Sequence, residues 1–417
     1  MVSLPKDLTL RLPRFKGFAP GAALSLQQPL TLLIGRNGTG KTNALEAFKL
    51  LAHLCRGGRL PEVTDVGGYG GYLEVRGGLP GCVPQDGGRR MALGLDLANH
   101  DGALRYDVAI DVDERGARIA TEELIVHEGA TQSVVFHLKA GQGPGAGFVV
   151  IPPDTGFPVS DDRTYLGRAD GGGEKTKAAD ELREAVRWLV DFRVFDFHPE
   201  AMRQFADHRL HQMAPNGFNV SAAAYALRAT NPEGFRQVEQ FIATIPDADA
   251  CKLGFVEAPN GQVMLELEEA TGRKYDARVL SDGTLRAIAV AVAMETTNPG
   301  SVVTIEEIER GLHPARARAL VKHILEAGSR RDARVLATTH SPAVLDALTV
   351  EQYGSIVVAR RGAGGHELVP FWSLPGAEYL AEKGRLGAAE TQEGLTGAAP
   401  PSRPAVDLDA LLGMGEP

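Results

Sequence analysis

The apolar positions of this chain follow two spacings, one typical of strands and one typical of helices. Leu8, Leu10 and Leu12 alternate with polar neighbours and predict a strand over residues 7–15. The unbroken apolar run over residues 30–34 predicts a buried strand. The residues that follow it have helical spacing and end at a pair of glycines, so we expect a helix there.

The middle of the chain alternates in the manner of an antiparallel sheet. Four segments with period two, separated by turn signals such as Asp101-Gly102, predict a meander. These segments are residues 91–98, 104–112, 118–127 and 133–139. Residues 141–173 are rich in glycine and have little periodicity, so we expect a surface excursion. Helical spacing returns over residues 178–190, 221–229 and 233–245.

In the last third of the chain, strands alternate with helices, which is typical of an α/β fold. These strands are residues 302–306, 334–338 and 355–359, and two further strands are expected before them, at residues 251–257 and 262–268. A long apolar helix is expected over residues 287–294. No apolar heptad pattern continues over several repeats, so we do not expect coiled-coil arms. After Gly387 the composition indicates a flexible tail.

Composition limits this outline further. The chain has 417 residues, more than one simple core supports, so we expect a main domain with an inserted lobe. The net charge of −9 implies that a nucleic acid would have to bind at a local basic patch. Cys55, Cys82 and Cys251 lie far apart, which argues against a disulfide framework and favours a cytoplasmic protein. The sequence shows neither an apolar leader nor a run long enough for a membrane span.

The clearest chemical signal is Gly35-Arg-Asn-Gly-Thr-Gly-Lys-Thr42, between the buried strand and the helix. The spacing GxxxxGK[ST] lets backbone N–H groups and a helix N-terminus converge on phosphate oxygens. Gly38 and Gly40 allow the tight backbone path, while Lys41 supplies an ammonium for the β- and γ-phosphates. The hydroxyl of Thr42 suits Mg²⁺. The stretch therefore predicts a phosphate-binding loop.

Three later segments suit the same chemistry. Ser281 and Gly283 begin the apolar helix and can face an anion, although such a turn is more often a simple helix cap. Glu306 and Glu307 end a buried strand, where one carboxylate suits Mg²⁺ and the other a nucleophilic water. His340 ends the next strand and is expected on the same rim, within reach of a γ-phosphate.

The order and spacing of these motifs resemble the ABC-type ATPase heads of the SMC, RecF and OLD group. Within that group they resemble the small AAA-family predicted ATPases of bacteria. The resemblance covers nearly the whole chain. The motifs that carry it are residues 35–43, 280–286, 305–314 and 338–341.

This resemblance implies an α/β fold, a P-loop NTPase of the ABC-ATPase type with an inserted antiparallel β and helical lobe and no coiled-coil arms. Residues 1–75 and 251–388 would form the ATPase core, with the phosphate loop in the first part. Residues 76–250 would form the inserted lobe, and residues 389–417 the flexible tail.

The resemblance also implies ATP and Mg²⁺ as cofactors and a homodimer that sandwiches the nucleotide. Ser281 and Gly283 of one subunit would touch the γ-phosphate bound by the other. Glu307 would polarise water, and His340 would be the switch histidine. Glu306 would hold the metal together with Thr42. The loop residues expected to bind the cofactor are Arg36, Asn37, Gly38, Thr39, Gly40, Lys41, Thr42 and Asn43.

Two departures from the family pattern bear on turnover. Glu306 stands where the family usually has aspartate, and its extra methylene is expected to shift the metal's water shell and slow hydrolysis. Ile308 replaces a proline, which matters less. The glutamine that completes the Mg²⁺ shell in ABC ATPases has no local signature here. Its candidates are Gln85, Gln132, Gln204 and Gln212.

Three functions stay open at this point. The favoured one is an ATPase that dimerises on ATP and acts as a nucleotide switch in a DNA-associated or anti-phage process, through a separate nuclease or toxin. A nucleotide-binding scaffold with little turnover is the second, and a transporter ATPase subunit is the third. The long insertion and the missing coupling loop argue against the transporter.

Three further groups of residues are not assigned a binding or catalytic role. Basic residues around 310–334 leave a nucleic-acid partner open, but solvated helix faces and the dimer contact are the favoured explanation for them. His198, His208 and His211 lack the further ligands of a metal site. The acid pair Asp407 and Asp409 lies in the expected tail, so we do not expect a nuclease centre there.

Overall fold

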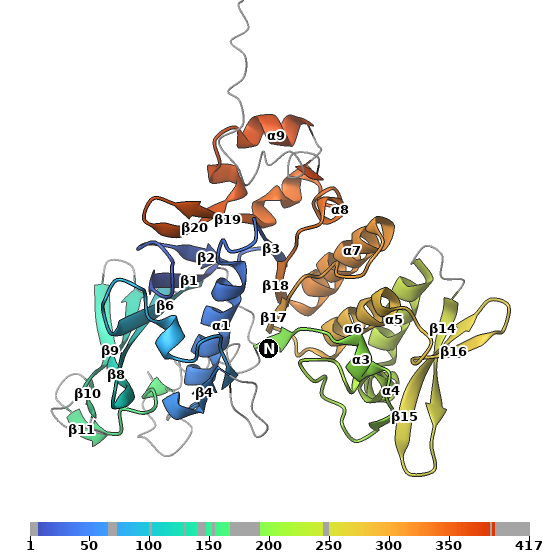
Figure 1. The fold of residues 1–417 in the computed structure, drawn as a ribbon, viewed down its shortest axis with the longest axis horizontal. Coiled ribbons are helices and arrows are strands. Elements are labelled where there is room, and N and C mark those ends of the chain that lie inside the picture. Colours follow the sequence, from blue (N-terminus) through green and yellow to red (C-terminus); the bar gives the residue numbers. More distant parts are fainter. Residues whose placement is uncertain are drawn as a thin grey trace, which may run out of the picture.

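The computed structural model describes residues 7–65, 73–99, 102–128, 131–140, 147–151, 155–166, 192–244, 250–383 and 386–387. A central sheet separates an antiparallel sheet with helix α1 (Lys41–Cys55) from a helical lobe (Figure 1). A third group of elements, β20 (Gly365–Pro370) and α9 (Ala377–Lys383) among them, lies at the far edge of the central sheet (Figure 1).

The central sheet has six strands and is parallel except at one edge. Its order is β12 (Arg193–Phe195), β17 (Val302–Ile305), β18 (Arg334–Thr338), β3 (Leu30–Ile34), β19 (Ile356–Gly362) and β20. Only β20 pairs antiparallel, with β19. The carboxyl ends of five strands therefore meet at one edge, as in the doubly wound α/β folds that bind ligands there. This confirms the α/β class expected from the sequence.

Alternate residues of the central strands pack into two different cores. Leu32 on β3 faces the helical lobe, and its neighbour Leu33 faces the side of α1. Val335 and Leu336 on β18 divide in the same way. Because successive side chains of a strand point to opposite faces, a continuous apolar run is needed when both faces are covered. That is why these strands read as unbroken apolar segments.

The antiparallel sheet has eight strands, listed here in spatial order. They are β11 (Thr155–Val159), β10 (Gly147–Ile151), β9 (Thr131–Ala140), β8 (Gly116–Glu128), β7 (Gly102–Asp113), β6 (Arg90–Asn99), β1 (Asp7–Arg14) and β2 (Ala23–Ser25). The predicted meander is thus confirmed. It also joins the N-terminal strand, because β1 pairs with β6. The domain boundaries given above stay a prediction.

Two strands of this sheet were not expected. β10 and β11 lie within residues 141–173, for which the sequence predicted only a surface excursion. On β10 the alternation is buried Val149 between exposed Phe148 and Val150, so the strand is apolar on both faces and short. Glycines and prolines around it hide the period of two. The helix expected over residues 178–190 lies outside the described residues.

The helical lobe packs three helices on a small sheet. α4 (Val220–Thr230), α5 (Pro232–Thr244) and α6 (Asp282–Thr296) match the predicted helices. The strands are β13 (Ala206–Asp207), β14 (Ala250–Glu257), β15 (Gln262–Glu269) and β16 (Lys274–Asp276). α7 (Pro314–Arg331) follows β17 and packs against α6.

The other described elements are short. They are β4 (Val63–Thr64), β5 (Leu73–Glu74), α3 (Pro199–Met202), α8 (Pro342–Leu345) and 3₁₀ turns at Leu60–Glu62, Pro80–Cys82, Val350–Ser355 and Phe371–Ser373. Within the described ranges the longest helix is α7, with 18 residues, so no coiled-coil arm is present there. None of the helices in these ranges is both long and apolar enough to cross a membrane.

Candidate functional site

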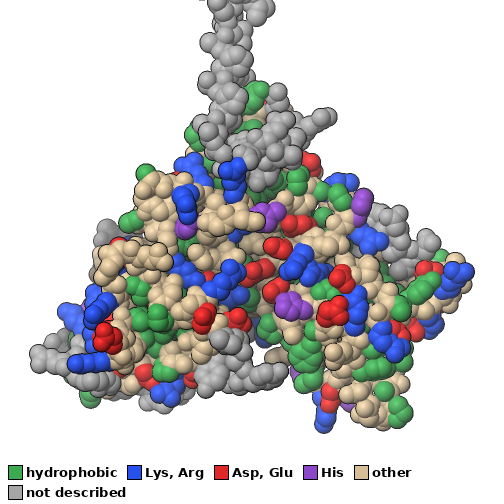
Figure 2. Space-filling model, viewed as in Figure 1, with side chains coloured by type: hydrophobic (Ala, Val, Ile, Leu, Met, Phe, Trp, Pro, Cys, Tyr) green, Lys and Arg blue, Asp and Glu red, His purple; other side chains and the backbone are tan. Residues whose placement is uncertain are grey.

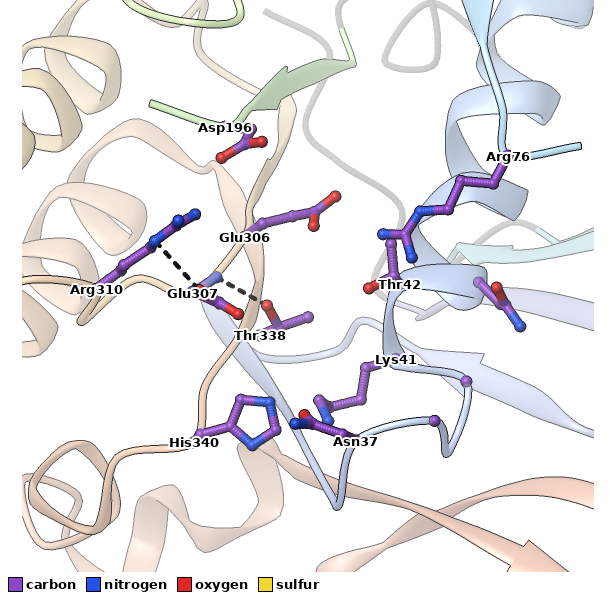
Figure 3. A pocket seen from close by; sticks show the side chains of 13 residues that line it. Asn37, Lys41, Thr42, Arg76, Asp196, Glu306, Glu307, Arg310, Thr338 and His340 are labelled. Carbon is purple, nitrogen blue, oxygen red and sulfur yellow. Dashed lines mark hydrogen bonds and ion pairs between the residues drawn. The ribbon is translucent and has the colours of Figure 1, made fainter. Parts of the chain in front are cut away.

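A cavity of about 500 Å³ opens at the carboxyl edge of the central sheet. Its lining residues are Asn37, Gly38, Gly40, Lys41, Thr42, Asn43, Arg76, Asp196, Glu306, Glu307, Arg310, Thr338 and His340. In Figure 3 the loop residues lie on one side and the acidic residues with His340 on the other. Acidic and basic side chains gather at the centre of the face in Figure 2.

The glycine loop leaves β3 and turns back into α1. Gly35 and Gly40 have φ angles of 146° and 98°, in the region that favours glycine. A Cβ on Gly35 would lie 2.2 Å from the carbonyl oxygen of Ala359, so a side chain cannot be placed there. Thr39 closes the turn by donating its hydroxyl to the carbonyl of Arg36, at 2.8 Å. The loop geometry thus follows from β3 lying between β18 and β19.

Lys41 and Thr42 begin helix α1 at the cavity. The Lys41 ammonium donates to the carbonyl of Gly35 at 2.6 Å and to that of Arg36 at 2.9 Å. The first N–H groups of a helix have no partners within it, and the helix dipole favours a negative charge at this end. The loop wall therefore suits phosphate. Arg36 and Thr39 shape the loop, but they are not among the residues that line the cavity.

Glu306 and Glu307 follow β17 at the opposite wall. The N–H of Glu306 donates to the carbonyl of Phe195 at 3.2 Å, which continues the pairing with β12. Glu307 has a φ of 46°, unusual for a residue with a side chain, and its N–H donates to the Thr338 hydroxyl at 2.8 Å. Strained backbone of this kind concentrates at functional sites. Here it turns the chain after β17 so that both carboxylates line the cavity.

His340 follows β18 and reaches the cavity beside Lys41 (Figure 3). Its backbone N–H donates to a carboxylate oxygen of Glu309 at 2.8 Å, which holds the turn after the strand. Partial desolvation lowers the pKa of His340, and the ammonium of Lys41 lowers it further. The imidazole is therefore neutral at pH 7, with one N–H to donate.

Four cavity residues were not named as site residues from the sequence. They are Arg76, Asp196, Arg310 and Thr338. Asp196 follows β12, the strand next to β17, so the parallel register places it beside Glu306. The available signal in the sequence was an acid that follows an apolar pair, Val194 and Phe195, but β12 has only three residues and only Phe195 is buried. None of the four candidate glutamines, all of them described, lines this cavity.

Arg76 comes to the cavity from a loop without a recognisable motif. Buried Glu46 on α1 accepts from the Arg76 backbone N–H at 3.2 Å and lies 3.5 Å from its guanidinium. The other oxygen of Glu46 pairs with Lys16 at 2.5 Å. A buried carboxylate with two basic partners fixes the start of this loop. The Arg76 side chain is 68% exposed and lines the cavity.

Ser281 and Gly283 are not among the residues of this cavity. Ser281 caps α6, and its hydroxyl accepts from the N–H of Thr284 at 3.2 Å. Arg203 donates to the carbonyl of Leu280 at 2.9 Å and so secures the turn. A Cβ on Gly283 would lie 2.3 Å from the carbonyl oxygen of Gly311, so this turn packs tightly on the segment after Glu307. Ser281 is exposed to solvent.

The donor set of the cavity fits Mg²⁺. The hydroxyl of Thr42 and the carboxylates of Glu306 and Asp196 are oxygen ligands, which this ion prefers. Among the described residues, no group of three or more His, Cys, Asp and Glu could hold a metal ion by itself. This fits an ion that is held by one or two protein groups together with substrate phosphates.

Comparison with known families gives one match. Residues 157–346 match the model of an AAA domain described as a putative AbiEii toxin of a type IV TA system. The matched segment contains Glu306, Glu307 and His340 but not the glycine loop.

Two further comparisons give a similar protein sequence and a similar solved structure. The chain is 30% identical over 185 residues to "Endonuclease MutS2" of Anaeromyxobacter sp. (strain Fw109-5). That match covers 43% of this chain, which spans only about a fifth of the relative, 22% of its length. Among solved structures, an SMC head bound to the C-winged helix domain of ScpA aligns with 88% of this chain and 97% of its own, with a TM-score of 0.53 and 12% identity. The fold is thus that of an SMC-type head.

Proposed function

We propose that the chain is a P-loop ATPase of the SMC/RecF-like group, which binds ATP with Mg²⁺ in this cavity and hydrolyses it. One observation carries the proposal: the cavity joins Lys41 and Thr42 of the glycine loop with Glu306, Glu307 and His340 of the strand ends. Phosphoryl transfer depends mostly on positioning and on charge stabilisation, which these groups can supply.

Each residue has a defined task in this proposal. The loop N–H groups and Lys41 bind the β- and γ-phosphates. Glu307 accepts the proton of the attacking water, and neutral His340 donates to a γ-phosphate oxygen. When bound, Mg²⁺ neutralises charge on the β- and γ-oxygens, and Thr42 and Glu306 would hold it. Arg310 keeps Glu307 oriented, since its Nε lies 3.7 Å from a Glu307 oxygen.

The test of this proposal is phosphate release from ATP by purified protein. We expect release that requires Mg²⁺ and is lost in Glu307→Gln, a variant that keeps the shape of the side chain. A matched control is Glu326→Gln on α7, whose carboxylate pairs only with exposed Lys322 among the contacts described. Equal release by wild type and Glu307→Gln would contradict the assignment of the base.

Dimerisation on ATP is the second part of the proposal. Ser281 is exposed at a helix start and is not a cavity residue, so a second copy can present it to the phosphates. ATP then contacts both copies only when they are closed, and it favours the closed state. We expect Glu307→Gln with ATP and Mg²⁺ to sediment as a dimer, and Ser281→Arg on that background to sediment as a monomer. Dimers that persist in Ser281→Arg would contradict this arrangement.

We propose that the biological output lies in a separate effector, a nuclease or toxin acting in phage defence. The description of the matching family model supports a toxin–antitoxin setting. The experiment is phage plating on cells that express the chain together with the proteins encoded beside it. Protection that is lost in Lys41→Ala would support the switch, and equal protection by this variant would contradict it.

A nucleotide-binding scaffold with little turnover is a second candidate, and one contact favours it. The carboxylate of Glu306 lies 3.4 Å from the ammonium of Lys49, so it is engaged by a protein cation. A phosphate-release rate near that of ATP alone, combined with tight ATP binding, would select this candidate over the ATPase.

A further inference from the structure

Lys49 lies on helix α1, and its ammonium pairs with the carboxylate of Glu306. Its Nζ is 3.4 Å from Oε1 of Glu306, and the two side chains are 19% and 20% exposed. We propose that Lys49 is a positioning residue that holds the Glu306 carboxylate and thereby weakens the grip of the nucleotide site on Mg²⁺. This inference rests on the proposed function, because it concerns the same site.

The spacing along α1 explains how Lys49 reaches the site. Thr42, Glu46, Lys49 and His53 recur at three to four positions and share one helix face. All four line a second cavity of about 580 Å³, which shares Thr42 and Glu306 with the nucleotide cavity. Lys49 therefore approaches Glu306 from the second cavity, and it is not among the residues that line the nucleotide cavity.

The unusual glutamate makes this contact feasible. A carbon–carbon bond is about 1.5 Å long, so an aspartate at the same position would end well short of the ammonium. The extra methylene that distinguishes Glu306 from the usual aspartate thus lets the carboxylate contact the Lys49 ammonium as an alternative to the metal ion. Glu306 and Lys49 are a matched pair: the longer acid on β17 meets a lysine on α1.

The acidic side chains near Glu306 have basic partners other than Lys49. Glu46, on the same helix face, is already paired with Lys16 at 2.5 Å. Asp196 lies 3.2 Å from the ring of His198, and both side chains are at least half exposed. Among the ion pairs of the described residues, Glu306 is paired with Lys49, in a largely buried position. There an ammonium competes directly with a divalent ion for the carboxylate oxygens.

If Lys49 competes with Mg²⁺ for Glu306, tight nucleotide binding needs a higher concentration of free Mg²⁺ than it would with an unpaired acid at this position. The experiment measures the affinity of the protein for a fluorescent ADP analogue at increasing MgCl₂ concentrations. The midpoint is the Mg²⁺ concentration at which half of the increase in affinity has occurred. In Lys49→Met we expect the midpoint to fall about tenfold, which corresponds to about 1.4 kcal/mol. Affinity measured in EDTA should be unchanged, because Lys49 does not line the phosphate cavity.

Two controls isolate the pair. Lys322→Met removes a lysine from an exposed ion pair on α7, 3.8 Å from Glu326, and should leave the midpoint unchanged. On a Glu306→Asp background, Lys49→Met should shift the midpoint less than twofold, because the shorter acid does not reach the ammonium. An equal tenfold shift on that background would overturn the inference.

Lys49→Gln serves as a second variant should Lys49→Met not fold, since it keeps a polar side chain, one atom shorter than lysine, and removes the charge. We expect the same shift. Mg²⁺-dependent binding with the wild-type midpoint in both Lys49 variants would overturn this inference alone. Wild-type protein that binds no nucleotide at any Mg²⁺ concentration would overturn the proposed function together with it.

Discussion

The two walls of the nucleotide cavity are built in different ways. The loop wall is one continuous segment, residues 37–43, whose shape follows from glycines and from a helix start. The opposite wall is assembled from the ends of β12, β17 and β18, which together span more than 140 residues of the chain. Local backbone geometry makes the first wall, and the register of a parallel sheet makes the second. The first should therefore govern binding and the second hydrolysis.

The largest effect is expected from the loop wall. Lys41→Ala removes the one ammonium that the loop offers to the phosphates, and losing a charged partner in a partly buried site costs roughly 3–5 kcal/mol. We expect ATP affinity to fall about 10³-fold, measured by calorimetry. Lys252→Ala, on β14 of the helical lobe, is a matched control at an exposed position. Unchanged ATP affinity in Lys41→Ala would show that the loop wall does not govern binding.

Acid should lower the stability of the folded chain through a buried histidine on α7, the helix that follows β17. His323 on α7 is buried and stacks on Phe241 at 4.7 Å, and burial lowers its pKa to about 4. The positive charge of Arg330 makes a smaller contribution to this lowering of the pKa. Between pH 6.5 and pH 4 the unfolded chain binds a proton at His323 that the folded chain does not, so stability falls on acidification.

The gap between the ordinary value and about 4 corresponds to a loss of about 3 kcal/mol across this window. Urea unfolding between pH 7 and pH 4 measures it. In His323→Phe, which keeps an aromatic ring, the loss should be smaller by about that amount. The same dependence on pH in this variant as in wild type would rule out His323 as its source.

Hydrolysis is the property that the second wall should control. Glu307→Gln removes the proton acceptor and is expected to slow turnover about 10²-fold while ATP affinity stays within a factor of two to three. Single-turnover kinetics measures the chemical step, and calorimetry measures the binding. If the variant lost affinity and kept its rate, the assignment of the two walls would be reversed.

A smaller effect is expected from Arg76, which belongs to neither wall. It reaches the cavity from a loop anchored by Glu46. Arg76→Ala should weaken ATP binding about tenfold, the scale of one charge-assisted hydrogen bond to phosphate. Arg209→Ala, which removes an exposed arginine paired with Asp207, is the control. Equal ATP affinity in Arg76→Ala and wild type would leave Arg76 as a lining residue without a binding role.

The difference between the walls also explains what could be predicted from the sequence. The glycine loop is a local pattern, and its strand, turn and helix are all present as expected. Glu306, Glu307 and His340 were placed on one rim because parallel strands end at one edge, and the structure brings them to one cavity. Their catalytic roles stay predictions.

What could not be predicted depends on contacts between distant segments. Asp196 follows a strand of three residues, too short for a pattern, and only its pairing with β17 places it beside Glu306. Arg76 is positioned by buried Glu46, a contact across 30 residues that no spacing encodes. β10 was missed because its exposed positions are as apolar as its buried ones.

The central claim is that ATP lies between the two walls of this cavity. A crystal structure of Glu307→Gln grown with ATP and Mg²⁺ tests it most directly. The account predicts a triphosphate on the loop from Gly38 to Thr42, with its γ-phosphate facing residue 307 and His340. A crystal in which ATP is bound elsewhere, with the glycine loop free of nucleotide, would contradict it.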